Sequence, residues 1–175
     1  IVFLIFDFNW GGNEAIQHAL HAHLREHGVH FVEPGSVVPS STGNLRANVL
    51  LHCVAVDGFY GSSADLIARV VSAALHRAVD FGCRTAAMPA LATGYGPLTM
   101  AEFATGLSQA IGVRGLALER LTVVVQKQED LDDLHRVLDR PGGRRLYRPV
   151  GLHEMVLIVN AEGREFPPRR PEQPI

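Results

Sequence analysis

The sequence predicts an α/β fold, in which helices cross over between the strands of one sheet. Short apolar runs rich in Val, Ile and Phe alternate with segments of helical periodicity, and no segment repeats another along the chain. The 175 residues are 47% hydrophobic, which is enough to form the core of one domain.

Seven segments are predicted to be strands because they are short, apolar and bounded by polar residues, glycine or proline. They are Ile1–Phe6, Val29–Val32, Ser36–Pro39, Asn48–Val56, Arg84–Met88, Leu121–Gln126 and Met155–Asn160. Four segments between them place apolar residues on one helical stripe. They are Asn13–His27, Ser63–Phe81, Thr99–Ile111 and Glu129–Leu138.

The predicted helix ends carry capping signals. Ser62 stands three residues before Asp65, and Thr99 stands three residues before Glu102, which is the spacing of a capping box. Glycine follows the first two helices, at positions 28 and 82, where a left-handed residue often ends a helix. These signals support the predicted boundaries.

The pattern changes after residue 139, and we divide the chain there. Residues 1–140 are predicted to form the α/β domain, residues 141–160 a C-terminal extension with one extra strand, and residues 161–175 a flexible tail rich in Pro and Arg. The chain opens with Ile1 inside a predicted strand, so we expect further residues before it.

Composition excludes several functional classes. The chain has 16 Lys and Arg against 18 Asp and Glu, a net charge of −2, which predicts no polyanionic nucleic-acid surface and no binding to anionic membranes. Cys53 and Cys83 both lie in apolar segments, so we expect neither disulfides nor a cysteine zinc site, and a reducing, cytoplasmic setting. No apolar run approaches the roughly 20 residues that span a bilayer.

A first candidate loop follows the opening strand, where Asn9, Gly11, Gly12 and Asn13 precede a helix. Such a loop lets backbone N–H groups approach a phosphate or another anion. Alternatively, the glycine pair makes a tight turn and Asn13 caps the helix. The residues leave both interpretations open.

A second candidate loop lies between the predicted strand at Arg84–Met88 and the helix that begins at Thr99. Gly94 and Gly96 flank Tyr95, so the backbone can approach a ligand closely and the ring can cover a sugar or base. Alternatively, this is a glycine–aromatic turn with the ring packed on the surface. The loop follows a strand, where α/β proteins bind ligands.

Other reactive side chains have simpler explanations. His23 and His27 are spaced to share a metal, but no third ligand stands at a diagnostic spacing, so we predict no metal and no cofactor. His52 and Cys53 lie within a predicted strand and are expected in the core. Motifs of P-loop nucleotidases, α/β-hydrolases and zinc proteases do not occur, and a phosphatase or esterase using His52 or Ser62 has little support.

Four features in a fixed order resemble the macro domain, a module that binds ADP-ribose. They are Phe8-Asn9 with Gly11-Gly12 and Ala15-Ile16; Gly35-Ser36-Val37-Val38 with Gly43-Asn44-Leu45; Val49-Leu50-Leu51-His52-Cys53-Val54; and Ala86-Ala87-Met88-Pro89-Ala90-Leu91-Ala92-Thr93-Gly94-Tyr95-Gly96. The resemblance extends from about residue 2 to residue 138, and its last feature is the most specific.

The resemblance implies a three-layer α/β/α sandwich with a mixed central sheet, and ADP-ribose or a related nucleotide-sugar diphosphate in a cleft between the two loops. It implies that Asn9 fixes the distal ribose and that the segment Gly11–Glu14, with Gly12 and Asn13, contacts the diphosphate and that ribose. The opposite side of the cleft would supply backbone N–H groups of Ala92, Thr93, Gly94, Tyr95 and Gly96.

The sequence also departs from the family pattern. The family's adenine-reading aspartate has no counterpart, and Asn13 stands where active hydrolases carry an acidic residue. An amide at position 13 cannot act as a general base, whereas the adjacent Glu14 is ionisable. Glu14, with Asn9 as the residue that fixes the distal ribose, is therefore the candidate catalytic pair of a weak ADP-ribosyl hydrolase, and the sequence leaves that activity open.

The expected partners are ADP-ribose or an ADP-ribosylated macromolecule, together with other domains of a longer chain. The alternative hypothesis is a degenerate macro-like interaction module of a larger protein that binds no ligand.

Overall fold

The structure is a computed structural model that describes residues 2–5, 14–42, 45–94, 96–112, 117–138 and 154–159. Its described strands form one six-stranded sheet in the order β2-β3-β1-β4-β5-β6. The strands are β1 (Val2–Ile5), β2 (Val37–Ser40), β3 (Val49–Cys53), β4 (Thr85–Pro89), β5 (Arg120–Val125) and β6 (Glu154–Val159). β2 pairs with β3 antiparallel and every other pair is parallel, which confirms the mixed central sheet.

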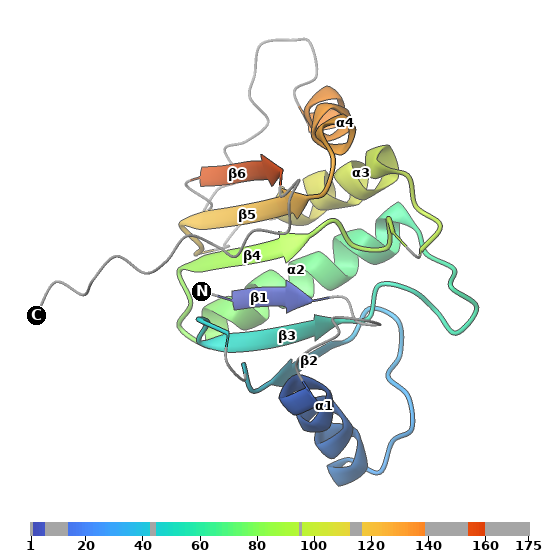
Figure 1. Cartoon of the computed structure of the whole chain (residues 1–175), viewed down its shortest axis with the longest axis vertical. Helices are drawn as coiled ribbons and strands as arrows, with labels where there is room; N and C mark the ends of the chain where they lie inside the picture. The colour runs from blue at the N-terminus through green and yellow to red at the C-terminus, as the bar shows by residue number, and fades with distance from the viewer. Residues whose placement is uncertain are drawn as a thin grey trace, which may run out of the picture.

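Four helices accompany the sheet in the described part of the chain: α1 (Glu14–Glu26), α2 (Ala64–Asp80), α3 (Met100–Ile111) and α4 (Gln128–Leu138). Figure 1 shows α2 and α3 behind the sheet, and α1 beside β2 at the lower edge. Across the sheet, the chain moves in one direction from β1 to β3. It moves in the opposite direction from β3 to β4 and from β4 to β5. Right-handed crossovers therefore place α1 on the face opposite α2 and α3, giving the predicted three-layer α/β/α arrangement.

The main core lies between the sheet and the pair α2 and α3. Its members alternate along the buried strands and recur at helical spacing on the two helices. The largest are Leu51, Ile67, Leu75, Met88, Leu91, Phe103, Leu107, Leu118 and Leu121. α2 and α3 approach closely at Gly106, where a Cβ atom would lie 2.4 Å from the Ala64 carbonyl oxygen.

The predicted strand at Val29–Val32 is wrong. This segment is a loop between α1 and β2, in which Val29 is 43% exposed and Phe31 72%. Val29 and the preceding Gly28 complete the end of α1. The N–H of Gly28 donates to the Arg25 carbonyl at 3.1 Å, and the N–H of Val29 donates to the Leu24 carbonyl at 3.0 Å. Apolar composition alone suggested a strand, but these N–H groups cap a helix.

The cap of α2 lies one residue later than the sequence suggested. Ser63, not Ser62, is the N-cap residue, and its Oγ accepts a hydrogen bond from the Leu66 N–H at 3.1 Å. The Ser62 hydroxyl instead donates to the Ala55 carbonyl at 2.6 Å and ties the preceding loop to the sheet. Gly82 follows α2 at φ +71°, as predicted for a helix stop.

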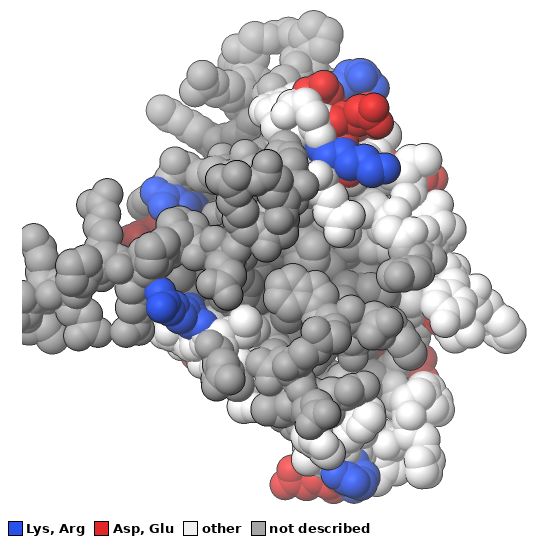
Figure 2. All heavy atoms as spheres, viewed as in Figure 1, with Lys and Arg blue, Asp and Glu red and all other residues white. Residues whose placement is uncertain are grey.

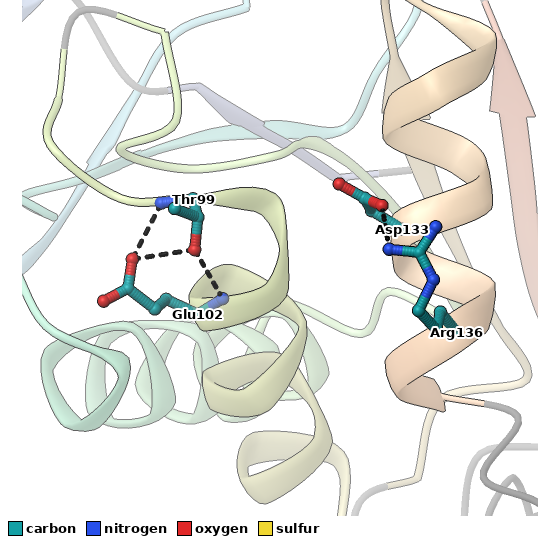
Figure 3. Close-up of polar contacts among 4 residues, drawn as sticks. All are labelled: Thr99, Glu102, Asp133 and Arg136. Carbon is teal, nitrogen blue, oxygen red and sulfur yellow. Dashed lines mark hydrogen bonds and ion pairs between the residues drawn. The ribbon is translucent and has the colours of Figure 1, made fainter.

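The predicted capping box of α3 is present. Thr99 Oγ1 accepts from the Glu102 N–H at 3.3 Å, while Glu102 Oε2 accepts from the Thr99 N–H at 2.8 Å (Figure 3). These bonds to Thr99 lower the pKa of Glu102 below its usual value. On α4, an ion pair joins Arg136 to Asp133 at 2.6 Å.

Thr99→Ala is expected to destabilise the protein by about 1 kcal/mol, since it removes one N-cap acceptor. Because the folded pKa of Glu102 is lowered, its stabilising effect is complete above the ordinary carboxyl pKa and is lost as pH falls through the folded value. Urea denaturation at neutral and at acidic pH measures this. An equal loss in the variant at both pH values would contradict the coupling between Thr99 and Glu102.

The predicted strand at Met155–Asn160 corresponds to β6, which pairs with β5 in parallel. Residues 139–153 and 160–175 lie outside the described residues. They include all of the predicted tail and most of the predicted extension. The domain boundary at residue 140 therefore stays a prediction.

Candidate functional site

The sheet order itself indicates where a ligand would bind. The chain leaves β1 toward β3 on one side and leaves β4 toward β5 on the other, so the topology reverses between β1 and β4. In α/β sheets, the crevice outside the carboxyl ends of two such strands is the usual ligand site. The loop after β4 and the segment after β1 are therefore the expected walls of the site, and they are the two candidate loops of the sequence.

Buried apolar side chains and internal hydrogen bonds hold the loop between β4 and α3 in place. Met88 and Leu91 are almost completely buried. The Thr93 hydroxyl donates to the Ala90 carbonyl at 3.0 Å, and the Leu98 N–H donates to the Ala92 carbonyl at 3.1 Å. The loop thus has one defined path before α3 begins.

Two backbone features at the centre of this loop depend on residue size. Ala92 adopts φ +56°, a left-handed conformation that is uncommon for residues with a Cβ atom. Gly96 packs directly on it, since a Cβ atom at position 96 would lie 2.4 Å from the Ala92 carbonyl oxygen and 2.8 Å from its Cα. Only glycine fits at position 96 without a backbone shift.

This path leaves backbone donors available. Within the described part of the chain, the N–H groups of Thr93, Gly94 and Gly96 donate to no other residue. Gly94 is exposed, and a Cβ atom there would meet nothing within 4 Å. Three N–H groups that donate to no described residue, on one constrained loop ahead of a helix N-terminus, form an arrangement that can bind an anion.

The structure brings Ala92, Thr93, Gly94 and Gly96 together on this loop. Five other candidate residues lie outside the described residues: Asn9, Gly11, Gly12, Asn13 and Tyr95. Glu14 is the first residue of α1, which fixes its backbone at the N-terminus of that helix.

His52 and Cys53 are core residues, as predicted. His52 is 6% exposed, and its Nε2 lies 2.8 Å from the Ser40 hydroxyl on the neighbouring strand β2. Burial raises the pKa of the Cys53 thiol to about 12, so it remains protonated at neutral pH.

Two histidines at the end of α1, His23 within the helix and His27 just after it, contact each other. The rings of His23 and His27 stack with centroids 4.1 Å apart, and His27 Nδ1 lies 2.8 Å from the His23 carbonyl oxygen. Among the described residues, no three potential ligands gather as a metal site would need. The described helices also include none that is long and apolar enough to cross a membrane.

Figure 2 shows where charge lies on the face seen in Figure 1. The described Lys and Arg side chains stand in separate groups near the periphery rather than in one stripe. The described Lys and Arg side chains on this face therefore form no continuous cationic patch.

Sequence reasoning missed one feature at the same edge of the sheet, the turn Asp57–Gly61 that follows β3. Phe59 and Tyr60 in this turn are 95% and 58% exposed. The sequence does contain a signal of a tight turn here, because Asp57-Gly58 and Gly61 flank the two aromatic residues. Their exposure could not be inferred from the sequence, because aromatic residues are more often packed.

Comparison with known proteins agrees with this architecture. The family model for the Macro domain matches residues 8–105, more than half of the chain. No curated protein matches the chain. Among solved structures, the Oceanobacillus iheyensis macrodomain with ADP has a TM-score of 0.64 and 19% identity, covering 79% of this chain and 82% of that chain.

Two further structures of the Oceanobacillus iheyensis macrodomain are similar to the same extent. A glycine-to-valine mutant with ADPR has a TM-score of 0.62 and 20% identity, covering 79% of this chain and 84% of its own. The structure with MES bound has a TM-score of 0.63 and 21% identity, over 79% and 82%. The sheet topology, the glycine loop after β4 and the family match agree, and this chain belongs to the macro domain family.

Proposed function

We propose that this chain binds ADP-ribose, or a related nucleotide-sugar diphosphate, in the crevice outside the carboxyl ends of β1 and β4. The observation that carries the proposal is the set of N–H groups of Thr93, Gly94 and Gly96 on the constrained loop after β4, which donate to no other described residue. A diphosphate matches this arrangement, because its oxygens accept several hydrogen bonds and its charge favours a helix N-terminus.

Two further observations support this ligand. Relatives of the same fold have been solved with ADP and with ADPR. The segment that follows β1 in the sequence carries Asn9, Gly11, Gly12 and Asn13, and β1 pairs with β4 in parallel, which supports a shared site at the carboxyl ends of these strands. In this proposal Asn9 fixes the distal ribose, and the glycine pair contacts the diphosphate together with Asn13. Tyr95 is proposed to cover the ligand from the loop after β4.

Isothermal titration calorimetry with ADP-ribose tests the proposal. We expect saturable binding, weaker binding of ADP because the distal ribose is missing, and little binding of adenosine because the diphosphate is missing. Equal affinity for ADP-ribose and adenosine would place the recognition elsewhere. No binding at high micromolar ADP-ribose would reject the proposal and favour the alternative of an interaction module without ligand.

The finer part of the proposal is slow ADP-ribosyl hydrolysis. Asn9 would hold the distal ribose, and Glu14 would supply the ionisable group nearest the bond to be cleaved. Asn13 stands where an acidic residue would act as general base, and an amide cannot take that role. We therefore expect only weak activity.

Loss of label from an ADP-ribosylated protein measures hydrolysis. We expect Asn9→Ala and Glu14→Ala each to slow release at least about tenfold if both act in the reaction. Glu14→Gln keeps the shape of the side chain and separates loss of charge from loss of packing. Equal rates in the wild type and in both alanine variants would exclude these residues from the mechanism.

A further inference from the structure

The turn after β3 has a rigid shape imposed by one carboxylate. Asp57 Oδ1 accepts hydrogen bonds from the N–H groups of Phe59 at 2.9 Å and Gly61 at 2.7 Å. The backbone closes the same turn, with the Tyr60 N–H donating to the Asp57 carbonyl and the Asp57 N–H donating to the Gly61 carbonyl. A Cβ atom at position 61 would lie 2.7 Å from Asp57 Oδ2, so a larger residue there would displace the carboxylate that holds the turn.

This turn holds two aromatic rings in solvent. Phe59 is 95% exposed and Tyr60 58% exposed, and Tyr60 adopts φ +63°. A left-handed conformation costs free energy in a residue with a Cβ atom, and an exposed Phe gains nothing from burial in this fold. The packing of the domain therefore does not account for the two side chains, whereas rigid exposed aromatics are efficient contacts for a partner.

The turn lies beside the proposed ligand site. β3 is parallel to β1, and β1 is parallel to β4, so the turn after β3 and the loop after β4 emerge at the same edge of the sheet. Two strand spacings separate them, on the order of 10 Å. Figure 1 shows the connection between β3 and α2 projecting beyond the strand ends at the right of the molecule.

The surroundings of the turn are mainly acidic. Asp57 is in the turn, and Asp65 is exposed in the first turn of α2. Glu33 is also exposed, two residues before Gly35. The Gly35 N–H donates a hydrogen bond to the Val54 carbonyl, which follows β3. Arg69 follows one turn further along α2. Asp57 in the turn and exposed carboxylates on the segments beside it disfavour a phosphate backbone and favour a polypeptide with basic residues.

We propose that the Phe59–Tyr60 turn binds the polypeptide to which ADP-ribose is attached, through an apolar side chain flanked by Lys or Arg near the modified residue. This inference rests on the proposed function. It adds that the protein selects among ADP-ribosylated proteins by their local sequence. In this inference the two aromatic side chains contact the polypeptide and not ADP-ribose, so the affinity for free ADP-ribose does not depend on them.

Calorimetry of the double variant Phe59→Ala/Tyr60→Asn tests this. Asn tolerates the left-handed conformation, so the turn keeps its shape. The ligands are free ADP-ribose, an ADP-ribosylated peptide with a Leu and two Lys beside the modified residue, and the same peptide with Glu in place of both Lys. We expect the wild type to bind the basic peptide about tenfold more tightly than free ADP-ribose, and the variant to bind both equally.

Phe81→Ala is the matched control, because Phe81 is an exposed Phe just beyond the other end of α2. It should leave all three affinities unchanged. Equal binding of the basic peptide by the wild type and the double variant would overturn the inference alone, as would equal binding of the basic and acidic peptides by the wild type. Absence of ADP-ribose binding by the wild type would instead reject the proposed function, and this inference with it.

Discussion

Gly96→Val is expected to lower the affinity for ADP-ribose about a hundredfold or more. The new Cβ atom would lie 2.4 Å from the Ala92 carbonyl oxygen, so the backbone of the loop after β4 must move. That movement displaces the N–H groups of Thr93 and Gly94 along with that of residue 96. Losing two hydrogen bonds to a charged diphosphate costs about 3 kcal/mol, which corresponds to more than a hundredfold in the dissociation constant.

Gly94→Ala is the control for this prediction. Position 94 lies in the same loop, but a Cβ atom there meets nothing within 4 Å, so the backbone path is preserved. Its thermal unfolding should match the wild type. Circular dichroism of both variants separates loss of the loop from loss of the fold. ADP-ribose binding by a folded Gly96→Val protein at wild-type affinity would contradict the role of this loop.

Gly106→Ala is expected to destabilise the protein by about 3 kcal/mol, the largest effect on stability that we predict. Helix propensity alone predicts the opposite, because alanine in a helix interior is favoured over glycine by about 1 kcal/mol. Packing dominates here: the added Cβ atom would lie 2.4 Å from the Ala64 carbonyl oxygen and 2.8 Å from Ile67 Cβ. α2 and α3 must separate, which disrupts the contacts of Phe103 and its neighbours.

Thr105→Ala provides the comparison on the same helix. Thr105 is the exposed neighbour of Gly106, and its hydroxyl donates only to the Ala101 carbonyl within α3 at 2.9 Å. This variant reports helix propensity without a change in packing, so its free energy of unfolding should stay within about 0.5 kcal/mol of the wild type or rise. If Gly106→Ala is as stable as Thr105→Ala in urea denaturation, the close approach of α2 and α3 is not what limits stability.

Local signals in the sequence located most of the secondary structure. The capping box of Thr99 and Glu102 marked the start of α3, because its hydrogen bonds join residues three apart in the chain. The same kind of reasoning placed the cap of α2 at Ser62 instead of Ser63, since either serine suits the pattern and only the path of the loop decides between them. It also predicted a strand at Val29–Val32, where apolar composition was not matched by a pairing partner.

The candidate site was predicted in part. Thr93, Gly94 and Gly96 were identified from glycine spacing and family resemblance, and they lie on the loop that follows β4. The resemblance could not show that their N–H groups donate to no other described residue, or that Gly96 packs on the backbone of Ala92. Both properties depend on loop geometry that residue types alone do not specify.

The sequence by itself determined most of the helices and strands and where most of them end, because periodicity and capping act over a few residues. The tertiary structure decided the strand order, which depends on pairing between segments far apart in the chain and is not encoded in the period of either strand. That order brings the ends of β1, β3 and β4 to one edge. It thereby places the loop after β4, where we propose anion binding, at the same edge as the exposed turn of Phe59 and Tyr60.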